Sequence, residues 1–160
     1  MFRTVCQATC ASLLCAMLAT PAMADVVVDY AGLAGSRDPG LRSDRDRRIV
    51  VAQLDRSIQE LGQRYLQPGQ DLRIDIVELD LAGDFEPWRS GMQDVRIMRD
   101  VTPPKIRIRY ALTQNGQPIQ SGEARLGDMN YLSDPRAMND SEPLIHEKLL
   151  LRDWFKKTFG

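Results

Sequence analysis

The dipeptide Asn115-Gly116 constrains the fold of this chain most, because it lies between two stretches with strand-like sequences. Asn-Gly is the pair best suited to the positive φ angles of a two-residue hairpin turn. Four apolar residues alternate with polar or small residues before the turn: Ile106, Ile108, Tyr110 and Leu112. The returning segment, about 117–126, contains Pro118 and Gly122, which favours the edge of a sheet over its centre. The sequence therefore predicts an antiparallel hairpin whose second strand lies at an edge.

Two segments have the periodicity of amphipathic helices. Five apolar residues recur every three or four positions within residues 43–66: Val50, Leu54, Ile58, Leu61 and Tyr65. Pro68 and Gly69 end this helix, and Gly62 inside it, which costs about 1 kcal/mol relative to Ala, indicates a close approach to the sheet. The second helix is expected to begin at Pro143 and to run to about Thr158.

Two further strands complete the predicted sheet. Residues 25–30 are rich in β-branched side chains, and residues 72–81 alternate but change phase midway, which requires either a bulge or burial of both faces. The resulting order is strand, helix, strand, long loop, strand, strand, helix. It predicts an α+β fold with a mixed β-sheet of about four strands and two helices packed on one face.

Residues 1–24 have the pattern of a secretory signal peptide. Arg3 precedes an apolar run from about Val5 to Leu18, and Ala22-Met23-Ala24 has the small-x-small pattern of a cleavage site. A helix of about 14 residues spans about 21 Å, which is less than a hydrocarbon core of roughly 30 Å, so an anchor is disfavoured. We therefore expect cleavage after Ala24, a periplasmic location, and a single α+β domain over 25–160.

The composition excludes several classes of function. All three cysteines, Cys6, Cys10 and Cys15, lie in the leader, so residues 25–160 contain neither a disulfide nor a thiol nucleophile. Lys and Arg total 21 against 22 Asp and Glu, which does not support binding to nucleic acid. No later segment has the length and hydropathy of a transmembrane helix.

No catalytic or cofactor-binding motif stands out in the sequence. There is no G-x-S-x-G, no phosphate-binding glycine loop and no H-E-x-x-H, so we expect no cofactor and a binding protein rather than an enzyme. The one histidine, His146, is placed by a helical wheel on the face away from the core, where we expect it to be solvated.

Two long loops, 82–104 and 126–140, hold the strongest candidates for a binding surface. They carry aromatic and arginine side chains of the kind enriched at interaction hot spots: Trp88, Arg89, Arg96, Arg99 and Tyr131. We expect Trp88 to fold back as a lid over the core, with contact to a partner as the alternative. The leading hypothesis is a soluble binding module for an unknown envelope protein or a small ligand.

Carboxylates suggest the alternative function. Asp80, Asp84 and Asp128 follow strands or lie in loops, where they could form a Ca²⁺ site or the acid and base of a hydrolase. Lys148 lies on the apolar side of the last helix, so it must either extend to solvent or find an acid, for which Asp80 and Asp128 are candidates. The alternative is a site lysine with a lowered pKa.

Four blocks of sequence resemble a known family. They are LAGDFEPW at 81–88, DVRIMRD at 94–100 followed by Pro103-Pro104, LGDMNYL at 126–132, and EKLLLRDWF at 147–155. This combination is similar to a family of exported proteobacterial proteins known only as a domain of unknown function. The resemblance implies an exported Gram-negative protein with one compact domain, and it implies no activity, ligand or site residue.

Overall fold

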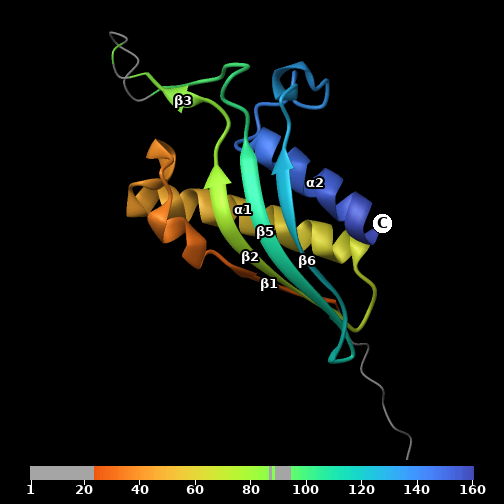
Figure 1. The fold of residues 1–160 in the computed structure, drawn as a ribbon. Coiled ribbons are helices and arrows are strands. Elements are labelled where there is room, and N and C mark those ends of the chain that lie inside the picture. The colour runs from red at the N-terminus through yellow and green to blue at the C-terminus, as the bar shows by residue number, and fades with distance from the viewer. Residues whose placement is uncertain (1–23, 87, 89–94) are drawn as a thin grey trace, which may run out of the picture.

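A four-stranded mixed sheet and two long helices form the body of the protein (Figure 1). The computed structural model describes residues 24–86, 88 and 95–160. The elements of the body are β1 (Asp25–Asp29), α1 (Asp44–Tyr65), β2 (Gln70–Asp80), β5 (Lys105–Gln114), β6 (Gln117–Gly127) and α2 (Ile145–Phe159). Smaller elements are the 3₁₀ helices η1 (Ala31–Gly35), η2 (Pro39–Leu41) and η3 (Tyr131–Ser133), and the strand pair β3 (Asp84–Phe85) and β4 (Arg96–Ile97).

The sheet has the order β1-β2-β5-β6, and both helices cover the same face of it (Figure 1). β1 pairs with β2 in parallel through the crossover α1, whereas β2 with β5 and β5 with β6 are antiparallel. The predicted α+β fold is therefore confirmed. The long loop between β2 and β5 projects from one end of the sheet and contains the β3–β4 pair (Figure 1).

Local sequence signals account for the shape of the sheet. The hairpin between β5 and β6 turns at Asn115 and Gly116, with φ angles of 51° and 77°, as the dipeptide predicts. The phase change in β2 is a β-bulge: Ile76 lies opposite Ile108, and Glu78 lies opposite Arg107, so Val77 has no counterpart. The bulge lets apolar side chains on both sides of it face the core.

The core lies between the covered face of the sheet and the two helices. It contains the predicted stripe of α1 and the apolar positions of the strands, with Ile58, Ile74, Ile108, Leu151 and Phe155 at or near zero exposure. α2 begins at Ile145 rather than at Pro143, because Leu144 takes a left-handed conformation with φ of 59° that ends the preceding turn. No helix among the described residues is long and apolar enough to cross a membrane.

Gly62 provides a test of the packing between α1 and the sheet. A β-carbon at this position would lie 2.3 Å from Cγ2 of Val26, so the predicted close approach is real. We expect Gly62→Ala to destabilise the protein by about 1–2 kcal/mol, because an overpacking cost of about 2–3 kcal/mol exceeds the gain in helix propensity of about 1 kcal/mol. Urea unfolding measures the change, with Gln63→Ala on the exposed side of the same helix as the control. A Gly62→Ala variant as stable as the wild type would contradict this packing.

Candidate functional site

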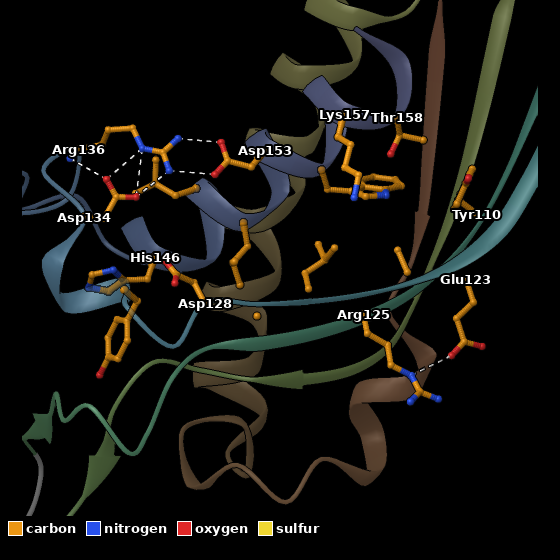
Figure 2. A pocket seen from close by; sticks show the side chains of 17 residues that line it. Tyr110, Glu123, Arg125, Asp128, Asp134, Arg136, His146, Asp153, Lys157 and Thr158 are labelled. Carbon is orange, nitrogen blue, oxygen red and sulfur yellow. Dashed lines mark hydrogen bonds and ion pairs between the residues drawn. The ribbon is translucent and has the colours of Figure 1, made fainter.

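A groove of about 600 Å³ runs between β6 and α2 (Figure 2). Its floor includes Ala124 and Leu126 of β6, and its wall includes Leu149, Leu150 and Trp154 of α2. The polar side chains that line it comprise four carboxylates, three cations, two hydroxyl groups of tyrosine, one of threonine and one imidazole: Glu123, Asp128, Asp134, Asp153, Arg125, Arg136, Lys157, Tyr110, Tyr131, Thr158 and His146. The groove therefore combines apolar side chains on its floor and wall with many polar and charged groups, so it offers both kinds of contact to a ligand.

Arg136 joins the loop after η3 to α2 at one end of the groove (Figure 2). Its guanidinium makes a bidentate contact with Asp153, at 2.7 and 2.9 Å, and also bonds Asp134, at 2.7 Å. These hydrogen bonds lower the pKa of both carboxyl groups and raise the pKa of Arg136. The triad carries a net negative charge, and Asp128 adds another in the same groove.

His146 points into the same end of the groove (Figure 2). Its ring packs edge-on against Tyr131, with centroids 4.7 Å apart, and its Nδ1 atom is buried without a hydrogen-bond partner. The expectation that His146 is solvated is therefore wrong, because the loop carrying η3 covers this side of α2. Buried polar atoms are usually hydrogen-bonded, so this nitrogen keeps an unused hydrogen-bonding capacity beside the groove.

The two long loops predicted to form one surface are joined by Tyr131. Its hydroxyl group donates to the carbonyl of Arg99 at 2.7 Å and accepts from the amide of Arg99 at 3.0 Å. The ring is 2% exposed, so Tyr131 lines the groove but acts mainly as a buried strut between the loops. Arg99 also forms an ion pair with Glu86 at 2.5 Å.

Arg96 makes its contacts inside the loop end, which is the end of the sheet where the loop between β2 and β5 projects. It forms an ion pair with Asp38, and its Nη1 atom donates to the carbonyl of Gly83 at 2.6 Å and to those of Leu81 and Ala82 at 3.2 and 3.3 Å. Asp38 in turn accepts from the amide of Leu81 at 2.7 Å. This network organises the chain where β2 ends, so Arg96 has few hydrogen-bonding groups left for a partner.

The three carboxylates of the alternative hypothesis do not share one site. Asp80 and Asp84 line a hollow of about 270 Å³ together with Lys105, whereas Asp128 lies in the groove. Burial, with the nearby Glu78 and Asp38, raises the pKa of Asp80. No group of three or more metal-ligating side chains occurs within the described residues.

Two other candidate residues, Trp88 and Lys148, do not line the groove. Trp88 is 76% exposed, so the expectation of a lid over the core is wrong. Arg89 lies outside the described residues. Lys148 lines a hollow between α1 and α2 and pairs with Glu142 at 2.5 Å, so neither Asp80 nor Asp128 is its partner. The helical wheel indicated that Lys148 needs an acidic partner, and that partner is Glu142, in the segment just before α2.

Glu147 is a buried carboxylate that the sequence did not point to, as is Asp38. Glu147 is 2% exposed, and its Oε1 atom accepts a hydrogen bond of 2.7 Å from the amide of Ala82. Burial raises the pKa of this carboxyl group, although the hydrogen bond opposes the shift. A glutamate in the first turn of a helix has an ordinary explanation in the helix dipole, so the sequence carried no signal for this contact.

An α+β domain with an open groove at the edge of its sheet is the class that the fold and site define. A family model for a protein of unknown function, DUF3016, matches residues 24–157, and the chain belongs to this family. Comparison with curated proteins finds no match, and neither does comparison with solved structures. The family therefore supplies no activity, and the function must be argued from the groove.

Glu147 gives a pH-dependent test of the loop end. Because its pKa is raised in the folded state, the wild type loses stability as pH rises from the ordinary value of 4.5 through the folded pKa. Glu147→Gln keeps an oxygen acceptor for Ala82 and does not ionise, so we expect it to gain stability over the wild type as pH rises. Glu147→Ala leaves a buried amide unpaired and should cost about 1–3 kcal/mol.

Urea unfolding of the wild type and both variants at pH 4 and pH 7.5 measures these effects. A difference between Glu147→Gln and the wild type that is the same at both pH values would contradict the raised pKa.

Proposed function

We propose that this protein is exported and works as a soluble, non-catalytic binding module in the periplasm. Its partner, an envelope protein or a small ligand, binds along the groove between β6 and α2 and against the loops 82–104 and 126–140. The observation that carries this proposal is the convergence of His146, Asp128 and the Arg136 triad on one open groove with apolar side chains on its floor and wall.

The chemistry of the lining residues supports binding over catalysis. Thr158 is the one aliphatic hydroxyl among them, and they include no serine or cysteine. Catalysis by His146 as a general base needs a nucleophile or a substrate proton within about 3 Å. The imidazole instead contacts the ring of Tyr131, whose hydroxyl group is engaged with Arg99.

The loop end supports the proposal in a second way. Tyr131 joins the two long loops, and Trp88 extends from one of them with most of its ring exposed. An exposed tryptophan on a loop is a common anchor for a protein partner. The buried contacts of Arg96 and Glu147 hold the frame from which these side chains project.

Export has a direct test. Expressed with its own leader in a Gram-negative host, the protein should be recovered in the periplasmic fraction with Asp25 as its first residue. Intact mass and N-terminal sequencing measure this, and replacing Leu13 and Leu14 by Arg in the apolar run is the matched control, because a charged run should leave the uncleaved chain inside the cell. An uncleaved chain in the membrane fraction would contradict the proposal.

Binding is tested by neighbouring lysines on α2. Lys157 lines the groove, whereas Lys156, which is also exposed and lies in the same last turn, does not. We expect Lys157→Glu to weaken capture of cross-linked periplasmic partners, or of a ligand found by native mass spectrometry, by about ten-fold, as for a charge at the rim of an interface. Lys156→Glu should bind like the wild type, and both variants should melt alike.

Trp88→Ala extends this test to the loop. It should weaken capture of a protein partner with little change in melting temperature, because the side chain has few contacts to lose. Equal capture by wild type, Lys157→Glu and Trp88→Ala would exclude the groove and its loop as the binding surface.

A further inference from the structure

β6 forms an unpaired edge of the sheet along the groove. β5 is its one neighbour in the sheet, and nine of its eleven residues are exposed. A long exposed edge offers a row of free backbone N–H and C=O groups to another strand. Residues 123–127 of this edge also line the groove beneath α2, so the space beside β6 is open (Figure 2).

The charges on β6 are arranged about its residue Ala124. Glu123 and Arg125 flank it and lie on the face of the sheet that the helices leave uncovered, opposite Arg109 and Arg107 of β5. Arg125 thus has a like charge directly across the ladder, and its side chain is 82% exposed. Glu78 pairs with Arg107 at 3.1 Å, and Glu123 lies 3.7 Å from Arg125 and 4.0 Å from Arg107, so the exposed Arg125 shares its one acid and gains from a second.

A second β6 strand provides this second acid in one register. When two copies pair antiparallel about a two-fold axis at Ala124, Glu123 of each copy lies opposite Arg125 of the other. Moving the axis by one residue, to Glu123 or to Arg125, places two like charges opposite each other instead. Like charges directly opposite are destabilising, so the charges select the register centred on Ala124.

Two further features agree with this register. It pairs Ser121–Gly127 of both copies and leaves Pro118, which has no N–H to donate, outside the paired segment. It also brings Ile119 of one copy level with Met129 of the other, and these side chains are 53% and 68% exposed in the single chain. An exposed apolar residue on each side of the axis, at equal distance, is what a self-complementary interface requires.

We propose that the protein forms a dimer through antiparallel pairing of β6 with β6 of a second copy, about a two-fold axis at Ala124. The two sheets become one sheet of eight strands, with all four helices on the same face. The hairpin end of the second copy then comes beside Asp128, so that both copies border the groove. This inference goes beyond the proposed function, since it concerns self-association and holds whether or not the groove binds a partner.

Charge reversal tests the register. The chain from Asp25 to Gly160, which contains every described strand and helix, is expected to be dimeric at tens of micromolar in analytical ultracentrifugation. Arg125→Glu and Glu123→Arg should each raise the dissociation constant by at least about ten-fold, because each sets like charges opposite each other. The double variant restores opposite charges and should return to within about three-fold of the wild type. Arg45→Glu, in the exposed first turn of α1, is the control for a charge reversal elsewhere.

A cysteine trap tests the axis independently of charge. Residues 25–160 contain no cysteine, so a single substitution reports on one contact. Across an antiparallel pair the two Cα atoms at the axis are about 4.5–5.5 Å apart, within the roughly 4.4–6.8 Å that a disulfide spans. Ala124→Cys should therefore give a covalent dimer under mild oxidation. Gln120→Cys should not, because its counterpart lies about eight residues away along the strand, or about 27 Å.

Three outcomes would overturn the proposal. The first is a wild-type chain that stays monomeric at several hundred micromolar. The second is a dimer that the single charge reversals do not weaken, or that the double variant does not restore. The third is cross-linking of Gln120→Cys as fast as that of Ala124→Cys. Circular dichroism checks that each variant folds, and if a single reversal does not fold, the cysteine trap decides.

Discussion

Two buried carboxylates hold the chain at the point where β2 leaves the sheet. The amide of Leu81 donates to Asp38, and the next amide, that of Ala82, donates to Glu147. The guanidinium of Arg96 donates hydrogen bonds to the carbonyl groups of Leu81 and Ala82. Backbone groups buried away from water need partners, and sheet pairing no longer provides them there. Side chains from η2, β4 and α2 replace the ladder, and the fold of the loop end depends on them.

The groove is a consequence of this arrangement. These contacts fix the loop before β5 and therefore the position of Arg99. The hydroxyl group of Tyr131 forms hydrogen bonds with the backbone of Arg99, and the ring of Tyr131 packs against that of His146. Arg136 connects the loop that carries Tyr131 to α2 through its contact with Asp153. The edge of β6 stays open beneath α2, which makes it available both to a ligand and to a second copy of the chain.

Much of the fold was predictable because its signals are local. The turn at Asn115 and Gly116, the apolar stripe of α1 and the close approach at Gly62 each depend on neighbouring residues or on one face of one element. The site was predictable only in part. Asp128 and Tyr131 line the groove as candidates, but the wheel gave His146 the wrong environment and could not identify Glu142 as the partner of Lys148. A helical wheel gives the direction of a side chain and not the loop that lies over it.

The sequence by itself determined the two helices and the four strands of the main sheet, their order and the absence of cysteine from residues 25–160, because periodicity, turn residues and composition act over a few positions. Tertiary structure alone decided the site. Asp38 and Leu81 are 43 residues apart, Asp38 and Arg96 are 58 apart, and Ala82 and Glu147 are 65 apart. Each of these contacts satisfies a buried polar group, and which distant side chain does so is settled only when the helices have packed on the sheet.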